Sequence, residues 1–418
     1  MFAFPYLEII SMIIKSIPIV FINPLFWVVI FLVWTQYRRT ASIEEKLFGA
    51  TINSVKDQTL VAILYGIIGG IIGSFLLIFV GVSISNIGLG FVWFLAIILM
   101  MIQPRFMCFS YAGGIVSLIS LILGYPKIDV PGLMAIVAIL HFIEGILIYT
   151  SGFKGTTPIF IKDNRYGVIG GFSLQKFWPV PIIILLTVIN QEIPEGVIQM
   201  PDWWPLVRPS PEIAKENLIY IMFPIVAGLG YGDMVLTSTP EKKSRLSAIN
   251  LSIFSLILLL LAIIASRISI FKYAAALFAP LAHEFLIYYG KGIEKKRIPV
   301  FIAPEKGEMV LDVLPGSPGY KMGLKRGDII LAINGMPINS KDDLKGFLNS
   351  YPTFIWIDGR DKDGNPFSYE YRNYREGISS LGAILVPREG ETVVSIHEAY
   401  EGILLRYIKK LIKERRKE

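Results

Sequence analysis

The chain has 418 residues, of which 53% are hydrophobic and 17% are charged, a composition too apolar for a soluble protein of this length. The net charge of +7 is modest and is explained by basic loops beside anionic lipid, so no nucleic-acid partner is needed. A single cysteine, Cys108, excludes a disulfide framework within the chain. The apolar residues occur in long runs as far as residue 290. We therefore predict a polytopic α-helical membrane domain over residues 1–290, followed by a small soluble domain.

The apolar runs predict about eight or nine transmembrane helices, because about 20 apolar residues cross a bilayer. The predicted spans cover residues 17–34, 60–82, 87–102, 106–123, 130–150, 178–190, 218–236, 248–264 and 270–289. The segment 178–190 is short and is interrupted by Pro179 and Pro181, so it either spans the bilayer or forms a re-entrant loop.

Two further features of these runs bear on packing and orientation. The second span contains small residues that let helices approach one another closely: Gly69, Gly70, Gly73 and Ser74. Basic loops at residues 241–245 and 291–297 predict, by the positive-inside rule, that the C-terminal side of the membrane domain is cytoplasmic.

Ionisable residues inside predicted spans are costly and often functional. The candidates are His141, Glu144, Asp233, His283 and Glu284. One hypothesis is that they converge on a buried polar site for a metal, a proton or a ligand. The other is that they pair with one another and fix the packing of the helices. No complete set of metal ligands is visible in the sequence, which favours the second hypothesis, and we expect neither a cofactor nor a metal.

The soluble region, residues 298–388, has short strand-like runs separated by glycine and proline turns. Ser317 precedes a proline that opens a short helix, Asn334-Gly335 predicts a tight hairpin turn, and Ser340 caps a helix with Asp343 three residues later. The run GLKRGDIILAINGMPI at residues 323–338 resembles bacterial PDZ domains. The resemblance implies a small α+β domain, a partly open β-barrel with two helices, that binds protein C-termini or internal peptides by strand addition.

The same resemblance implies a peptide groove between one strand and one helix. Its approximate residues are Pro299, Val300, Phe301 and Ile302 on the strand, and Leu344, Phe347 and Leu348 on the helix. Beyond the PDZ region, residues 394–418 have the pattern of a basic amphipathic helix. Such a helix either rests on anionic lipid or packs against the soluble domain.

A membrane domain joined to a PDZ domain also suggests a site-2-type intramembrane metalloprotease, whose His-Glu-x-x-His helix binds zinc. The last predicted span contains His283 and Glu284, but the second ligand position holds Ile287, which cannot bind a metal. We therefore predict no catalytic residue and no enzyme, and keep an intramembrane protease or its inactive relative as the alternative. A small-solute carrier is less favoured, because the chain has no convincing internal repeat.

Several phrases outside the PDZ region resemble the MinJ-like family of PDZ-containing membrane proteins. They lie at residues 23–26, 38–39, 141–144, 170–181, 200–206 and 227–233. Members of that family are topological determinants of cell division. The resemblance implies a multi-pass scaffold of the bacterial plasma membrane, with a cytoplasmic PDZ domain, enriched at septa and poles. It also implies a link between a DivIVA-type protein and MinD-type division proteins, and it brings no catalytic residues.

Overall fold

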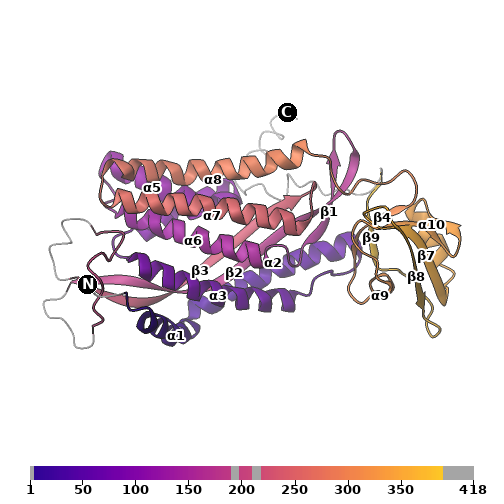
Figure 1. Cartoon of the computed structure of the whole chain (residues 1–418), viewed down its shortest axis with the longest axis horizontal. Helices are drawn as coiled ribbons and strands as arrows, with labels where there is room; N and C mark the ends of the chain where they lie inside the picture. The colour runs from indigo at the N-terminus through magenta and orange to yellow at the C-terminus, as the bar shows by residue number, and fades with distance from the viewer. Residues whose placement is uncertain (1–3, 190–196, 210–217, 389–418) are drawn as a thin grey trace, which may run out of the picture.

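The computed structural model describes residues 4–189, 197–209 and 218–388. It has two parts, an elongated N-terminal domain of helices that surround a narrow sheet, and a C-terminal domain at one end of it (Figure 1). The expected amphipathic helix at residues 394–418 lies outside the described residues.

Helices make up most of the N-terminal domain. They are α1 (Tyr6–Ile22), α2 (Pro24–Phe48), α3 (Val55–Val80), α4 (Leu89–Ile102), the 3₁₀ helix η1 (Pro104–Met107), α5 (Phe109–Leu123), α6 (Val130–Ser151), α7 (Pro240–Ala265) and α8 (Ile270–Lys296). In the described part of the chain, α3, α6, α7 and α8 are long and apolar enough to span a membrane, and the α1–α2 pair, bent by 73°, adds a fifth if it counts as one span. The structure therefore supports a membrane domain, but it does not confirm eight or nine transmembrane helices.

Two of the predicted spans, residues 178–190 (with a re-entrant loop as its alternative) and 218–236, are β-strands as far as the structure describes them, so the prediction that they are transmembrane helices was wrong. The strands of the N-terminal domain are β1 (Thr157–Asp163), β2 (Gly167–Ile189) and β3 (Leu218–Val235). They form an antiparallel sheet in the order β1-β2-β3. The β2–β3 pairing runs from Phe172 opposite Val235 to Ile189 opposite Leu218, and β2 lies along α3 (Figure 1). Two prolines placed two residues apart in β2 disfavour a regular helix there, and its many β-branched residues favour a strand.

One edge of β2 is closed by helices instead of by a strand. Beyond Ser173, β2 has no register with β1, so alternate backbone groups face the helices. Two of these positions, Pro179 and Pro181, have no N–H to satisfy. At Ile183 the N–H donates to Ser74 Oγ of α3 at 2.8 Å. Hydroxyls of Tyr37 and Ser85 accept from two further β2 amides, at 3.2 and 3.0 Å. Closing the edge in this way meets the requirement that backbone groups among apolar helices be hydrogen-bonded.

The small residues of α3 pack against two different neighbours. A β-carbon at Gly70 would overlap the carbonyl oxygen of Pro181, and one at Gly66 would overlap that of Pro179. On another side of α3, a β-carbon at Gly73 would overlap Ile143 of α6. The predicted close packing at this stretch is confirmed, but one of the two partners is a strand and not a helix.

The C-terminal domain contains β4 (Glu308–Val313), α9 (Pro318–Met322), β5 (Ile329–Ile333), β6 (Met336–Pro337), α10 (Lys341–Leu348), β7 (Phe354–Arg360), β8 (Pro366–Arg372) and β9 (Ala383–Leu385). Its sheet has the order β8-β7-β5-β4-β9, with β6 paired to β5. The predicted local signals are confirmed. Ser317 caps α9, and Asn334 and Gly335 have φ of 50° and 76° in the hairpin turn. Ser340 Oγ accepts from the N–H of Asp343 at 3.1 Å and caps α10.

Candidate functional site

The C-terminal sheet ends in β9, which pairs with β4 and has no further strand neighbour in the described sheet. Leu381 and Leu385, just before and within β9, share a buried core with Leu344 and Leu348 of α10. Phe347, also on α10, packs on this core while remaining half-buried. An end strand beside a helix is the arrangement that accepts an added peptide strand.

The structure places the predicted groove strand elsewhere. The N–H of Gly170 in β2 donates to the carbonyl of Phe301 at 2.9 Å, and the N–H of Val300 donates to the carbonyl of Leu236 at 2.8 Å. The Phe301 side chain is buried with its ring centroid 5.4 Å from that of Phe172. The strand residues of the prediction, from Pro299 to Ile302, therefore join the two domains, while the predicted helix residues lie on α10.

A second contact holds the two domains together through a buried acid. Arg326 forms an ion pair with Asp312 at 2.8 Å, and its guanidinium lies 4.5 Å from the centre of the Phe172 ring in β2. The start of α10 also reaches the N-terminal sheet, since Lys341 Nζ lies 5.3 Å from the centre of the Phe160 ring in β1. The face of the C-terminal domain that carries β4 and β9 is thus packed on the base of β1 and β2.

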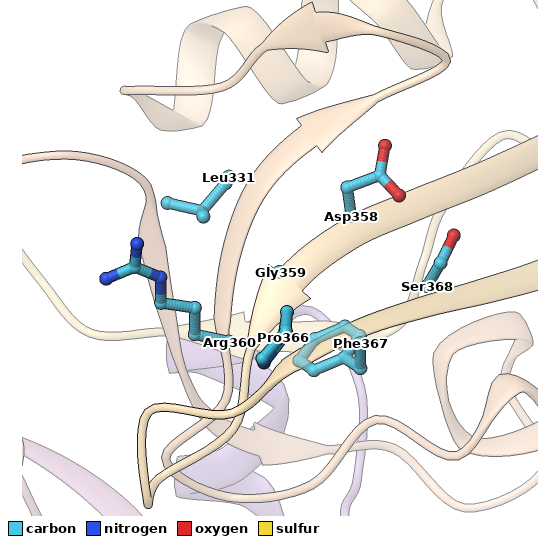
Figure 2. A pocket seen from close by; sticks show the side chains of 7 residues that line it. All are labelled: Leu331, Asp358, Gly359, Arg360, Pro366, Phe367 and Ser368. Atoms are coloured by element: carbon cyan, nitrogen blue, oxygen red, sulfur yellow. The ribbon is translucent and has the colours of Figure 1, made fainter.

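A separate pocket lies at the opposite end of the C-terminal sheet. Figure 2 shows its lining, which comes from β5, β7 and β8: Leu331, Asp358, Gly359, Arg360, Pro366, Phe367 and Ser368. Because β8 and β9 are the two ends of the sheet order, this pocket is not part of the edge at β9.

The intramembrane candidates divide into separate places. His141, near the middle of α6, and His283, near the middle of α8, come together, with ring centroids 5.2 Å apart. Cys108, which we had not singled out as a site residue, lies between them at the turn that leads into α5. Its Sγ is 3.0 Å from His141 Nε2 and 3.9 Å from His283 Nε2.

Glu284 lies beside this cluster and is fully engaged with other groups. It pairs with Arg105 at 2.9 Å and accepts a hydrogen bond from the hydroxyl of Tyr111. The same Tyr111 oxygen is 3.3 Å from His283 Nδ1. The α4–α5 turn, which carries Arg105 and Cys108, is therefore connected to α8 by an ion pair and by a chain of hydrogen bonds.

The two remaining candidates do not join the cluster. Asp233, in β3, lies 3.5 Å from Lys243, which in turn lies 3.4 Å from Glu294. Lys243 is buried between the two carboxylates. Asp233, Lys243 and Glu294 therefore form an ion-pair network that connects β3 to α7 and α8. Glu144 is one helical turn from His141, and within the described residues it takes no part in the Cys108 cluster.

Sequence reasoning found the two histidines but missed the cysteine. The ligand-type atoms of Cys108, His141 and His283 all lie within 4.8 Å of one another, although the residues are far apart in the chain. The signal that could have found the cysteine was the composition: the chain has one cysteine and three histidines, so few residues of these types could form a cluster. No spacing rule applies to ligands that come from three separate helical segments.

Comparison with known proteins first defines the class. A family model described as "PDZ domain" matches residues 309–350, the segment from β4 to the end of α10. The periplasmic serine endoprotease DegQ of Escherichia coli is 49% identical over 41 residues, which are 10% of this chain and 9% of that protein. Together with the apolar helices, this match makes the chain a PDZ-containing membrane protein.

The likeness that extends beyond the PDZ domain is to a division protein. The chain is 24% identical over 400 residues to the cell division topological determinant MinJ of Bacillus subtilis, covering 91% of this chain and 97% of MinJ. A probable MinJ of Lacticaseibacillus paracasei is 22% identical over 249 residues, 59% of this chain and 62% of that protein. The chain is therefore MinJ-like over nearly its whole length, and nothing in these matches points to catalysis.

Proposed function

We propose that this protein is a membrane scaffold that recruits cytoplasmic division or polarity proteins and so helps to place the division site. The observation that carries the proposal is the likeness to a cell division topological determinant across 91% of the chain, which includes both the membrane domain and the PDZ domain. The apolar helices provide the attachment to the bilayer, and the PDZ domain provides a peptide-binding edge.

The edge at β9 is the place where a partner peptide binds in this proposal. The peptide adds to β9 as an extended strand and lies along α10, with its side chains against Leu344, Phe347 and Leu348. The backbone pairing supplies affinity, and the side chains beside α10 supply selectivity. Partners of the DivIVA type and the MinD type are the proposed ligands, bound through their termini or through internal segments.

The distribution of basic residues supports a cytoplasmic position for the PDZ domain. Arg165, at the β1–β2 turn, donates to the carbonyl oxygens of Lys295 and Arg297 at 3.0 and 3.4 Å. The β1–β2 turn and the C-terminal end of α8 lie at the end of the N-terminal domain that adjoins the PDZ domain (Figure 1). Clusters of basic residues remain preferentially on the cytoplasmic side of the membrane.

The experiment is to follow a fluorescent fusion of the full chain in dividing cells. The proposal predicts enrichment at septa and poles, and loss of that enrichment in a Phe347→Ala variant, which removes a half-buried ring beside the proposed groove. The matched control is Tyr374→Ala, an exposed ring of the same domain that is 71% accessible. An even membrane distribution of the unaltered fusion, at normal protein level, contradicts the proposal.

A further inference from the structure

The chain's single cysteine and two of its three histidines meet in the interior of the membrane domain. They come from three elements: the turn between η1 and α5, the middle of α6 and the middle of α8. His141 is buried, with 4% of its surface accessible, while Cys108 and His283 are half-buried. Placing polar side chains among membrane helices costs free energy, so such residues are usually paired or functional. A thiol and two imidazoles are good ligands for zinc and copper.

The orientation of each ring is set by its other nitrogen. His141 Nδ1 lies 2.7 Å from the carbonyl oxygen of Val137, an acceptor, so Nδ1 carries the proton and donates. His283 Nδ1 lies 3.3 Å from the Tyr111 hydroxyl. Both Nε2 atoms are left facing the sulfur of Cys108. This division of roles, with one ring nitrogen anchored and the other presented, is typical of histidines that bind metals.

The spacing fits one metal ion among the three atoms. A tetrahedral zinc with its usual bond lengths separates a sulfur ligand from a nitrogen ligand by about 3.6 Å. The two observed distances, 3.0 Å to His141 and 3.9 Å to His283, lie on either side of that value. Cys108 Sγ also accepts a hydrogen bond from the N–H of Ser110 at 3.4 Å, at the start of α5, where a helix N-terminus favours negative charge.

The surroundings support the ligands in a second layer. Tyr111 connects His283 to Glu284, and Glu284 is paired with Arg105. A carboxylate placed behind a ligand histidine orients the ring and raises its basicity. The ring of Phe254 packs against both histidines, with centroids 5.6 and 5.7 Å away, which limits the access of water on that side.

We propose that Cys108, His141 and His283 bind a Zn²⁺ ion. On binding, the thiol proton of Cys108 leaves to solvent and the thiolate and the two Nε2 atoms become ligands, with a fourth position left for water or another small ligand. The ion ties the α4–α5 turn to α6 and α8. This site does not depend on the adaptor role proposed above, and its failure leaves that role untouched.

The test measures zinc in the purified full chain in detergent, after exposure to Zn²⁺ and removal of loosely bound metal. The proposal predicts about one zinc per chain, and loss of most of it in Cys108→Ser and in His283→Ala. Tyr111→Phe is expected to weaken zinc binding about 10- to 100-fold, as removal of a supporting hydrogen bond does at other metal sites. The matched control is Glu144→Gln, one turn from His141 but outside the cluster, which retains the metal. Equal zinc in all variants, or none in the unaltered chain, overturns the proposal.

A second measurement needs no variant and so is unaffected by misfolding. Because Cys108 is the chain's single cysteine, labelling by a membrane-permeant maleimide reports on this site alone. The proposal predicts slow labelling in the presence of Zn²⁺ and rapid labelling after a chelator is added, while Mg²⁺ gives no protection. A labelling rate that is the same with Zn²⁺, with chelator and with Mg²⁺ contradicts it.

Discussion

The two sheets of this protein differ in how the backbone groups at their edges are paired. The edge of β2 among the helices is closed by prolines and by hydroxyls from α2, α3 and the α3–α4 connection. The edge of the PDZ sheet ends in β9 with no further strand neighbour in the described residues. Backbone groups cannot remain unpaired among apolar helices, whereas an end strand without a second strand neighbour can pair its backbone with a peptide. The closed edge serves packing, and we infer that the open edge serves recognition.

The largest expected effect comes from separating β2 from α3. Gly70→Val places side-chain atoms where the carbonyl oxygen of Pro181 now lies. This oxygen belongs to the backbone of β2, so it cannot move aside without moving the strand. We expect a loss of about 3 kcal/mol or more in unfolding free energy, seen as a large drop in thermal stability in detergent. Gly90→Val is the control, because a β-carbon there has nothing within 4 Å. Equal stability of the two variants contradicts the proposed packing.

A smaller effect is expected when one closing hydroxyl is removed. Ser74→Ala leaves the N–H of Ile183 without its acceptor at 2.8 Å, in a buried position. The expected cost is about 1–3 kcal/mol. Thr35→Ala serves as the comparison, since the Thr35 hydroxyl bonds to Leu32 of its own helix on an exposed side. If both changes cost the same in thermal unfolding, the edge of β2 is not closed as described.

The contact between the two domains can be weakened at its ion pair. Arg326→Gln removes the partner of Asp312, which is buried, while Arg326 is one-third exposed. Solvent screening reduces the effect, so we expect a loss of about 1–2 kcal/mol, seen as faster hydrogen exchange at the base of β2. Arg372→Gln breaks an exposed pair with Glu370 and is expected to change little. Unaltered exchange in Arg326→Gln contradicts a role for this pair in docking.

The smallest effects concern pH and two aspartates of the PDZ domain with opposite behaviour. The hydrogen bond from the N–H of Asn339 lowers the pKa of Asp343, so its stabilising contribution is present at neutral pH and is lost as pH falls through that lowered pKa. Burial raises the pKa of Asp328. Its contribution is therefore greatest below the unfolded pKa of about 3.9 and is lost as pH rises through the raised pKa.

An NMR titration of the aspartate carboxyl carbons checks both directions. Spectra of Asp343→Asn and Asp328→Asn in the full chain assign the two resonances. We expect the Asp343 midpoint below, and the Asp328 midpoint above, that of an ordinary aspartate. Midpoints in the reverse order contradict the contacts described for these residues.

The sequence predicts a region well where short local motifs set its turns and helix starts, and poorly where tertiary contacts decide its structure. The elements of the PDZ domain are predicted by short local motifs. Ser317 and Ser340 each cap the start of a helix, and Asn334-Gly335 forms the hairpin turn. The β2–β3 hairpin has no such local mark. Both faces of β2 are apolar because helices cover it, so hydropathy alone does not separate it from a helix. Pro179 and Pro181, placed two apart on one edge, were the available signal.

The candidate sites depend on tertiary contacts that the sequence does not show. Phe301 looked like a groove residue because it begins the PDZ region, yet its partners Gly170 and Phe172 lie far upstream. Cys108 could not be joined to His141 and His283 by spacing, since each sits on a different helical segment. The α10 residues were easier to predict, because their helix follows directly from the Ser340 cap.

The most direct test of the account is photocrosslinking from the proposed groove in dividing cells. A photoreactive phenylalanine analogue at Phe347 of the full chain replaces one ring by another, and the same analogue at Tyr374 is the control position. The account predicts that Phe347, and not Tyr374, crosslinks to a cytoplasmic division protein of the DivIVA or MinD type, at the septum or pole. Identical crosslinking patterns at the two positions, or none to any division protein, would contradict the claim that this edge recruits the division machinery.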